Sequence, residues 1–514
     1  MAKPHPAPLP PTRCRRRTLM EDDTVKIAFI GPKWNEMVNA YPSLGLGYLA
    51  AVAEQDGHEC RIFDFGLRPK RPLAEEVQDV VDFKPDLVAF TSMTTSYASV
   101  EEAAAMLKEA LGVTIVIGGP HATTLPDLTL ENPNIDFLVY GEGEEVFRDF
   151  LRALEAGDTN WGKIKGLWYK EDGHIVSGGE RPLIKDLDAL PYPARHLFEL
   201  DKYPLYAPNG EPMLTVLSSR GCPWNCSFCF KGIVGRTYRQ RSPKNIADEL
   251  EHVIETYGVR NFYFIDDLFT IDVRRLNGIL DHLIERKLDI RWRCLARVDR
   301  VNPELLKKMY KAGCRQIHYG IESGNPEVLK RTAKHINLNQ VRDAVRWTAE
   351  AGIHSKGYFI LGLPGDTIET MEETIEFAAS LPLTEAMFSI ATPMPGTQLW
   401  EELLRKRPET KYNADFTKSY YYNSYTSEIA PFMNVSEVSD DVLSAMAIKA
   451  RQRFLEAKKR RMYRQSFGEP LGDLLWAVSR VEPLRKMGSA LTRVGFFGHF
   501  RRVKEAYFGA GAWS

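Results

Sequence analysis

Cysteine is scarce in this chain, with seven residues among 514. So few cysteines exclude a small disulfide-stapled scaffold and fit a reducing compartment. Long apolar runs are absent too, because no window reaches the roughly 20 apolar residues that a membrane-spanning helix needs. Charge of one sign is also lacking: the formal net charge is −1, so no overall basic field indicates a nucleic-acid partner. The chain is nevertheless long enough for two or three domains with real cores.

The first 23 residues differ in composition from the rest of the chain. They contain five prolines and an arginine-rich stretch, and no apolar segment of signal-peptide length follows these charges. We expect residues 1–23 to form a disordered leader, with Met20 as an alternative start of the protein.

Three of the cysteines lie close together, at Cys222, Cys226 and Cys229. Thiolate is the ligand of iron–sulfur clusters, and three thiolates at this spacing can hold three irons of a 4Fe–4S cube. No fourth cysteine lies nearby, so one iron would stay open for a reactant. A zinc knuckle, with His252 as the nearest downstream histidine, is one alternative, although it needs a fourth ligand at short spacing. A disulfide plus a spare thiol is another, and it requires an oxidising compartment.

The remaining cysteines are scattered along the chain. We expect them to be buried or free thiols rather than disulfide partners; they are Cys14, Cys60, Cys294 and Cys314.

Residues 24–158 alternate short apolar runs with helical patterns. This alternation, with glycine-marked turns, predicts an α/β fold with a parallel, doubly wound sheet of the Rossmann-like kind. Ligands of such sheets bind beyond the carboxyl ends of the strands. The predicted strands are 26–30, 60–65, 86–91, 114–118 and 136–140, and the predicted helices are 44–54, 100–111 and 144–154.

A second alternation fills residues 210–410, after a hairpin and a proline-punctuated linker at 159–209. Six strand–helix repeats predict a partial (βα)6 barrel of the TIM type, since a closed barrel of eight needs about 250 residues. Barrel active sites collect at the carboxyl ends of the strands, and the cysteine segment directly follows the first strand. The predicted strands are 213–219, 261–265, 291–296, 316–321, 357–361 and 386–391.

Residues 411–514 are predicted to be mainly helical, with one helix over 443–464. The basic run at 458–461 is interpreted as a solvated helix face rather than as a surface for anions or membranes. Together with this helix, a tyrosine-rich segment is expected to border the substrate pocket; its tyrosines are Tyr420, Tyr421, Tyr422 and Tyr425.

The cysteine spacing, with Phe228 before the last cysteine, resembles the signature of the radical SAM enzymes. In that family the open iron chelates S-adenosylmethionine (SAM), and electron transfer releases a 5′-deoxyadenosyl radical. Polar and glycine-rich turns after successive predicted strands match further family motifs, including a Pro-Gly-Thr turn at 395–397. Each turn alone is a weak signal, because tight turns commonly use glycine and proline. The resemblance implies SAM contacts from Phe228, Asp266, Arg297, Glu322, Ser323, Gly362 and Pro364.

The first domain resembles the cobalamin-binding domain that is fused to one class of radical SAM enzymes. The resemblance rests on residues 42–51, 91–92, 118–123 and 141–144. It implies that glycines let the backbone approach a flat corrin, while hydroxyl groups meet its amides and nucleotide tail. The implied cobalamin contacts are Ser43, Leu44, Gly45, Thr91, Ser92, Gly118, Gly119, His121, Gly141 and Glu142.

One part of the cobalamin pattern is missing. Domains of the methionine-synthase type carry Asp-x-His-x-x-Gly after the first strand, and this histidine ligates cobalt; residues 31–36 here contain no histidine. We therefore expect cobalamin to bind without such a ligand, and His121 to bond backbone or the corrin edge rather than cobalt. The alternatives are a degenerate Rossmann-like fold that binds nothing and a nucleotide site, which lacks Gly-x-Gly-x-x-Gly after the first strand.

The resemblance covers roughly residues 25–400 and implies an enzyme with a 4Fe–4S cluster, SAM and cobalamin as cofactors. The leading expectation is methyl transfer to an unactivated substrate centre. The alternatives are a ring-forming or oxidative reaction without methyl transfer, as in the anaerobic magnesium-protoporphyrin ester cyclases, and a non-catalytic cobalamin or cluster sensor. We expect a small-molecule substrate, an external flavodoxin- or ferredoxin-like electron donor and a cytoplasmic location. Residue types alone assign no catalytic acid or base and no substrate class.

Overall fold

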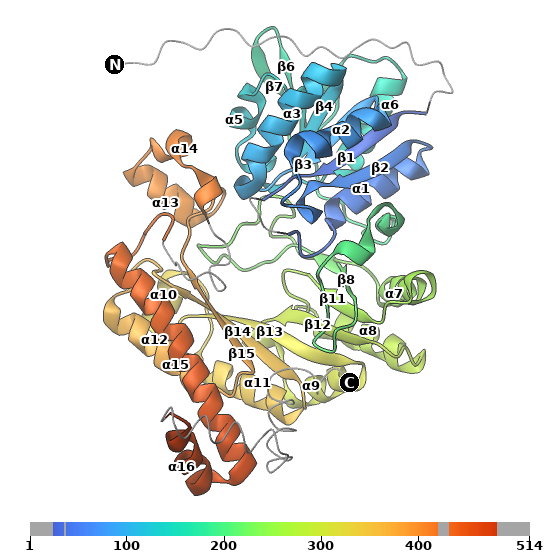
Figure 1. Cartoon of the computed structure of the whole chain (residues 1–514). Helices are drawn as coiled ribbons and strands as arrows, with labels where there is room; N and C mark the ends of the chain where they lie inside the picture. Colours follow the sequence, from blue (N-terminus) through green and yellow to red (C-terminus); the bar gives the residue numbers. More distant parts are fainter. Residues whose placement is uncertain (1–23, 35–37, 420–430, 481–514) are drawn as a thin grey trace.

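A computed structural model describes residues 24–34, 38–419 and 431–480 of the chain. Within these ranges the chain forms two large α/β sheets and a helical region that follows the second sheet (Figure 1). The predicted leader, Met20, Cys14 and the tyrosines at 420–425 lie outside the described residues.

The first sheet has seven strands in the described part of the chain, in the order β2-β1-β3-β4-β5-β6-β7. Strands β1 to β5 are parallel, and the order reverses between β1 and β3, which is the switch point of a doubly wound sheet. The strands are β1 (Lys26–Gly31), β2 (Glu59–Asp64), β3 (Leu87–Thr91), β4 (Thr114–Gly118), β5 (Phe137–Val139), β6 (Leu167–Glu171) and β7 (His174–Ser177).

Helices cover both faces of this sheet, as the doubly wound prediction requires. Along β1, Ile27 and Phe29 join the core on one face, while Ala28 and Ile30 join the core on the other, because side chains alternate along a strand. Helices α1 (Leu44–Gln55) and α6 (Glu144–Glu155) pack on the first of these cores. The second core lies beneath α2 (Leu73–Phe83), which is not among the predicted helices, α3 (Tyr97–Leu111) and α5 (Pro126–Glu131).

The hairpin expected at 161–177 is present as β6 and β7, which pair antiparallel with β5 and with each other. Leu167 and Tyr169 of β6 are buried in the core beside Phe137. The first sheet therefore continues through residues that the sequence places in a linking segment.

The second sheet has six parallel strands in chain order within the described residues, which confirms the partial (βα)6 barrel. Helices lie along its outer side (Figure 1). The strands are β8 (Met213–Val216), β11 (Asn261–Phe264), β12 (Arg291–Ala296), β13 (Cys314–Glu322), β14 (His354–Leu361) and β15 (Glu385–Ile390). The helices between them are α7 (Pro243–Tyr257), α8 (Val273–Glu285), α9 (Pro303–Lys311), α10 (Pro326–Arg331), α11 (Leu338–Glu350) and α12 (Ile368–Ser380).

A helical region follows, as predicted, and its longest helix packs on the outside of the barrel. Leu443, Met446 and Ala450 on α15 contact Leu361 and Met371 in one apolar cluster. None of the helices in the described ranges has the length and apolarity needed to cross a membrane. The helices of this region are α13 (Gln398–Lys406), α14 (Thr410–Asn413), α15 (Asp440–Phe467) and α16 (Glu469–Ser479).

The basic run at 458–461 is only in part the solvated face that the sequence predicts, since Lys459 and Arg460 are exposed. Lys458 is buried, and Arg461 donates a hydrogen bond to the carbonyl of Ala379 at 2.6 Å. Arg460 pairs with Asp473 of α16 at 2.8 Å. These cations attach α15 to its neighbours, because a helix packed on two sides must give its charges local partners.

Candidate active site

The three clustered cysteines lie in the loop between β9 (Ser219–Arg220) and β10 (Arg239–Gln240), which follows β8. We call residues 221–238 the cysteine loop. Cys222 and Cys226 are buried, Cys229 is exposed, and all three are free thiols. The loop therefore begins at the carboxyl edge of the second sheet, where barrel active sites lie.

Close backbone packing fixes the start of the cysteine loop. Gly221 has a φ of +86°, and a Cβ at this position would stand 2.3 Å from the carbonyl oxygen of Thr237. Only glycine fits such a conformation and such a contact. Phe228 packs farther along the loop against an apolar cluster formed by Val328 of α10 and by Leu363 and Ala391, which follow β14 and β15.

Charged groups surround the thiols. Burial raises the pKa of the Cys222 thiol, while the charges of Lys231 and Asp267 act on it in opposite directions. The same two charges act on Cys229, so these thiols share one electrostatic environment. A thiol must lose its proton to bind a metal, and binding at this loop would therefore release protons.

The donor set of the cysteine loop fits an iron–sulfur cluster better than the alternatives. No group of three histidine, cysteine or acidic side chains in the described part of the chain has the arrangement that one metal ion requires. A structural zinc needs four ligands on one ion, whereas a cluster takes one thiolate per iron. The cysteines that the structure describes are all free, so the disulfide alternative gains no support either.

The two carboxylates that follow β11 point in different directions. Asp266 is fully buried and accepts hydrogen bonds from the Ser218 backbone N–H at 3.2 Å, the Ser218 hydroxyl at 2.7 Å and the Ser219 hydroxyl. Asp267 is exposed and acts electrostatically on the thiol of Cys222. Asp266 thus holds the segment that leads into the cysteine loop, and Asp267 lies nearer to the thiols.

Arg297, which follows β12, is already bound within the protein. Its guanidinium donates to both carboxylate oxygens of Asp299, at 2.9 and 3.2 Å, and to the carbonyls of Lys334 and His335. The indole of Trp224 lies 4.4 Å from the guanidinium carbon. The resemblance implies a contact between Arg297 and SAM, whereas in the structure the guanidinium links Trp224 of the cysteine loop to residues 334–335.

Glu322 and Ser323 occupy a strained strand end. Glu322 ends β13 with a φ of +68°, a left-handed conformation that costs a non-glycine residue energy, and it accepts a hydrogen bond from Lys334 Nζ at 2.8 Å. Ser323 is buried and hydrogen-bonds the Thr374 hydroxyl of α12 at 3.0 Å. Strain of this kind persists where the surroundings hold it, and it is typical of ligand sites.

The turn after β14 is held in the same way. Gly362 has a φ of +77°, and a Cβ there would stand 2.8 Å from the side chain of Leu443 on α15. Beyond Pro364, Asp366 accepts hydrogen bonds from the Leu363 backbone N–H at 3.0 Å and from the Thr370 hydroxyl at 2.9 Å. The predicted SAM residues of the second sheet therefore share one edge, and most of their side chains already have protein partners.

The carboxyl edge of the first sheet brings two of its predicted turns together. The backbone N–H of Ser92 donates to the Gly118 carbonyl at 3.0 Å. Gly119 has a φ of +94°, and a Cβ there would stand 2.8 Å from the Thr91 hydroxyl. These turns follow the neighbouring strands β3 and β4, beside the switch point, where ligands of open α/β sheets bind.

His121 is buried at this edge, in the short helix α4 (Pro120–Thr124), and its ring stacks on Tyr97 with centroids 3.8 Å apart. Burial lowers its pKa to about 3, so the imidazole is neutral. Neither ring nitrogen has a hydrogen-bond partner among the described residues, contrary to the expected backbone bond. Unpartnered buried nitrogens fit a ligand that carries its own donors and acceptors, such as the amide-fringed corrin of cobalamin.

The start of α1 also lies at this edge. Ser43 caps the helix and accepts a hydrogen bond from the Leu46 backbone N–H at 3.5 Å, while Leu44 is buried and Gly45 is exposed. The cap satisfies a free helix N–H. The structure therefore shows an ordinary helix start at these three residues, with Gly45 open to the surroundings.

The carboxylate of Glu142 is bound by protein groups. It is buried and accepts hydrogen bonds from Arg220 at 2.9 Å, from Arg239 at 2.6 Å and from the Ile184 backbone N–H at 2.9 Å. The sequence groups Glu142 with the cobalamin contacts because it follows Gly141 at a strand end. In the structure its charge is needed by the two arginines that flank the cysteine loop.

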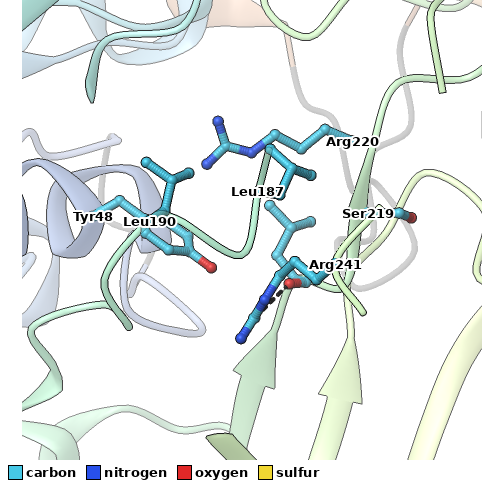
Figure 2. A pocket seen from close by; sticks show the side chains of 7 residues that line it. Tyr48, Leu187, Leu190, Ser219, Arg220 and Arg241 are labelled. Atoms are coloured by element: carbon cyan, nitrogen blue, oxygen red, sulfur yellow. Dashed lines mark hydrogen bonds between the residues drawn. The ribbon is translucent and has the colours of Figure 1, made fainter. Parts of the chain in front are cut away.

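Glu144 completes this contact between the two sheets. Arg220 donates to its carboxylate at 2.5 Å, and the same guanidinium lies 5.3 Å from the ring of Tyr48 on α1. Figure 2 shows Tyr48 and Arg220 approaching from opposite sides, with Arg241 nearby. Only about 10 Å³ of free space remains there, roughly the room for one water molecule. The joint is therefore packed, and neither cofactor can bind in it.

Sequence reasoning missed the residues that join the sheets, because their partners are far away in the chain. Arg220 and Arg239 lie in or next to the cysteine motif, yet their carboxylates are 76 to 97 residues away. Two acidic residues in the Gly-Glu-Gly-Glu segment at 141–144 are the one available signal. A buried cation needs a buried anion, but the sequence does not show that these groups are buried.

Comparisons with known proteins agree with this architecture. Residues 216–378 match the model of the radical SAM superfamily, and residues 35–151 match the model of the B12 binding domain. The first match runs from the end of β8 into α12, and the second covers β2 to β5 of the first sheet with their helices.

Several curated proteins are similar over most of the chain. An uncharacterized methyltransferase from Pyrococcus horikoshii is 36% identical over 412 residues, which are 80% of this chain and 86% of the relative. The cytidylyl-2-hydroxyethylphosphonate methyltransferase of Streptomyces wedmorensis is 30% identical, over 71% of this chain and 78% of the relative. The anaerobic magnesium-protoporphyrin IX monomethyl ester cyclase of Rubrivivax gelatinosus is also 30% identical, over 82% and 76%.

Two solved structures share the fold. The radical SAM methyltransferase TsrM from Kitasatospora setae, with cobalamin and a 4Fe–4S cluster bound, has a TM-score of 0.65 at 19% identity, covering 75% of this chain and 78% of that one. The cobalamin-dependent SAM radical enzyme OxsB, with aqua-cobalamin and SAM bound, has a TM-score of 0.66 at 15% identity, covering 96% and 85%. At these identities the likeness concerns the fold alone.

Proposed function

This chain belongs to the cobalamin-dependent radical SAM enzymes, and from that premise we propose that it transfers a methyl group from SAM, by way of cobalamin, to an unactivated centre of a small-molecule substrate. One observation carries the proposal: Glu142 and Glu144, beyond the carboxyl end of β5, hold Arg220 next to the cysteine loop. Groups bound at the two sheet edges would therefore lie on either side of one interface.

We assign the cofactor contacts as follows. The three thiols of the cysteine loop are the cluster ligands. SAM lies at the strand ends of the second sheet, where Asp267 follows Asp266. Cobalamin rests on the turns at 91–92 and 118–119 and on His121. When bound, these cofactors supply a radical and a centre for methyl transfer. The residues assigned to SAM are Phe228, Asp267, Glu322, Ser323, Gly362 and Pro364, and Asp266 and Arg297 support this edge from behind through their hydrogen bonds within the protein.

The protein's own contribution is to bind the cofactors, to orient them and to shield them from solvent. The strained Glu322 and the glycine turns at 119, 221 and 362 are held by buried contacts, so the strand ends are rigid before any ligand arrives. Arg297 positions the cysteine loop through Trp224. We further propose a flavodoxin- or ferredoxin-like electron donor and a cytoplasmic location, because an oxygen-labile cluster needs a reducing environment.

An isotope experiment tests the proposal. The anaerobically reconstituted protein is incubated with methyl-labelled SAM, a reductant and a small-molecule extract from cells that lack the gene, which supplies unmodified substrate. We expect label in a product, together with equal amounts of S-adenosylhomocysteine and 5′-deoxyadenosine. A new product without label, formed together with 5′-deoxyadenosine, would rule out methyl transfer.

A ring-forming or oxidative reaction is the second candidate, because a cyclase is among the relatives at 30% identity. Both reactions consume SAM reductively, and only methyl transfer puts the label into product. Reductive SAM cleavage by the purified protein would also exclude the non-catalytic sensor.

A further inference from the structure

The inner face of the second sheet carries an unusual set of polar side chains. Along β12, Trp292, Cys294 and Ala296 are buried in the core against the helices, so Arg293 points to the opposite, inner face. Tyr263 on β11 and His318 on β13 lie beside it, outside the apolar core of the helix side. Together with Tyr358 of β14 we call these four residues the inner cluster: Tyr263, Arg293, His318 and Tyr358.

Arg293 carries a charge without a counter-ion. Its guanidinium carbon lies 4.3 Å from the Tyr263 ring, its buried Nε has no hydrogen-bond partner, and no carboxylate of the described residues comes within ion-pair distance. Burial lowers its pKa. Arg293 is half-buried, and a partly desolvated guanidinium without a counter-ion is costly for a folded protein. The fully buried arginines, by contrast, all donate hydrogen bonds to protein groups; they are Arg195, Arg220, Arg239, Arg241, Arg275 and Arg297.

His318 adds a second unpartnered group beside Arg293. Its side chain is 4% exposed, and its Nδ1 lies 3.1 Å from the Tyr358 hydroxyl. Nε2 is buried and has no hydrogen-bond partner among the described residues. Burial, followed by the charges of Arg293 and Lys356, holds the pKa of His318 well below its usual range, so the ring is neutral. If the Tyr358 hydroxyl donates to Nδ1, Nε2 carries the proton and becomes a second donor.

After burial, which lowers the pKa of Arg293, the charge of Glu385 acts to raise it, but Glu385 makes no ion pair with Arg293. Lys356 already pairs with Glu385 at 3.6 Å, and Gln316 donates to the same carboxylate at 3.0 Å. Tyr41 of the first domain is close enough for the Arg293 charge to oppose the rise in its pKa that burial causes. The inner cluster is therefore reached from the first domain as well as from the barrel.

We propose that the inner cluster binds an anionic oxygen group of the substrate, a carboxylate or a phosphate, through the Arg293 guanidinium and His318 Nε2–H. The geometry matches this chemistry, because a guanidinium fork pairs with two oxygens and a neutral imidazole adds a third hydrogen bond. The inference rests on the proposed function, since it names the class of molecule that enters the same site.

The position of the inner cluster also predicts the shape of the substrate. Arg293 lies on β12, four residues before Arg297, which directly follows that strand; this corresponds to about 13 Å along the sheet. Arg297 marks the strand end at which the radical would form. The reacting centre should therefore lie on the order of 10 Å from the anionic group. The same separation argues that SAM, placed at the strand ends, does not supply this anion.

A thermal-shift experiment tests the anion site without the unidentified substrate. The probes are inorganic phosphate and acetate, each compared with chloride at equal ionic strength. The variants are Arg293→Met and Arg293→Lys, and the control is Arg291→Gln on the same strand, because Arg291 already pairs with Asp289 at 2.6 Å. The comparison with variants is needed because phosphate stabilises many proteins by exclusion from their surface.

We expect phosphate or acetate at tens of millimolar to raise the melting temperature of the wild type and of Arg291→Gln by about 2 °C more than that of Arg293→Met. Arg293→Lys should keep part of the shift. Without anion, Arg293→Met should melt no lower than the wild type, because it removes an unpaired charge. Equal anion shifts in the wild type and Arg293→Met would overturn the proposal.

Activity and cofactor measurements then separate this inference from the proposed function. With the same cell extract, Arg293→Met should lose the labelled product while retaining SAM cleavage, iron and corrin. If iron, corrin or SAM binding falls instead, Arg293 serves a cofactor and the substrate assignment is wrong. If the wild type makes no labelled product but the anion shift depends on Arg293, methyl transfer fails and the anion site stands.

Discussion

The two sheets use the residues after their strands in different ways. In the second sheet the polar side chains are mostly bound within the protein, as Asp266 is by Ser218 and Ser323 is by Thr374. In the first sheet the backbone turns hold one another, and His121 keeps both ring nitrogens without a partner among the described residues. The comparison shows that polar side chains at the second edge are fixed by protein partners, whereas the first edge contains a buried imidazole that has no partner among the described residues.

Glu142 and Glu144 are the exception on the first sheet, because they act as frame residues for the other domain. The two edges are therefore one structure joined by buried charge, although each sheet has its own core. The following substitutions test whether cofactor binding and stability at one sheet depend on the other, from the largest expected effect to the smallest.

Cys222→Ala should abolish cluster binding at the second sheet and leave corrin binding at the first sheet intact. Removing one thiolate leaves two ligands, so we expect iron content and 5′-deoxyadenosine formation to fall to background while corrin binding stays within about twofold of wild type. Iron, sulfide and corrin analysis after anaerobic reconstitution measures both effects. The control is Cys60→Ala, a half-buried thiol of the first domain, which should change neither. Loss of corrin in Cys222→Ala would show that the edges are not separate.

Glu142→Ala should lower the free energy of unfolding, because it removes buried ion pairs between the two sheets. It removes one of the two carboxylates that pair with Arg220 and the only one among the described residues that pairs with Arg239, and breaking a buried ion pair in this way costs about 3–5 kcal/mol. Urea unfolding of the apoprotein measures the loss. The matched control is Glu145→Ala, whose exposed carboxylate pairs with Arg181 at 3.2 Å, and it should cost less than about 1 kcal/mol. Similar losses in both variants would mean that the buried joint adds no stability.

Gly119→Ala should damage the first edge alone. The new Cβ combines an unfavourable φ of +94° with a 2.8 Å contact to Thr91, so we expect a loss of more than about 2 kcal/mol together with weaker corrin retention. Gly157→Ala is the control, because its φ is +63° and a Cβ there would meet nothing within 4 Å. That change should cost about 1 kcal/mol and leave corrin retention unchanged. Unfolding curves and corrin absorbance report the two quantities.

His121→Phe should change the pH dependence of the first domain. The folded pKa of about 3 lies below the usual 6.5, so the unfolded chain takes up the proton first as pH falls. Wild-type stability should therefore decline from pH 6.5 downward, and the variant, which has no such proton, should gain about 2 kcal/mol relative to wild type between pH 7.5 and pH 5. Urea unfolding of the apoprotein at the two pH values measures this gain.

The exposed His174 of β7 provides the control, because His174→Phe should show no such gain. Corrin retention by His121→Phe near the wild-type level would show in addition that the imidazole is not a cobalt ligand. A constant stability difference between wild type and His121→Phe at both pH values would contradict the buried, neutral ring.

Much of the fold follows from local patterns. The apolar runs of the parallel strands, the hairpin and the helix now seen as α15 were all predictable, because strands buried on both faces and packed helices leave strong periodic signals. The cysteine spacing likewise indicates a cluster, because its three ligands are close neighbours in the chain. The strand order of the first sheet and its extension by β6 and β7 were not predictable, since pairing partners leave no local pattern.

The functional assignments divide in the same way. Thr91, Ser92, Gly118 and Gly119 could be proposed from the sequence, because turns after strands have a recognisable composition. Glu142 was grouped with these contacts for the same reason, because the sequence pattern of a carboxylate at a strand end is the same whether it meets a ligand or an arginine. Nothing in the sequence marked Arg293, one arginine among many, as unpaired.

The sequence by itself determined which cofactors this protein can hold, because thiolate spacing and glycine turns are properties of contiguous residues. Only the tertiary structure decided which charges are satisfied. Arg220 pairs with Glu142 and Glu144 between the two sheets. Arg293, on the inner face of the barrel, makes no ion pair with any carboxylate of the described residues. Burial makes that difference costly, and burial is set by the whole fold rather than by neighbours in the chain.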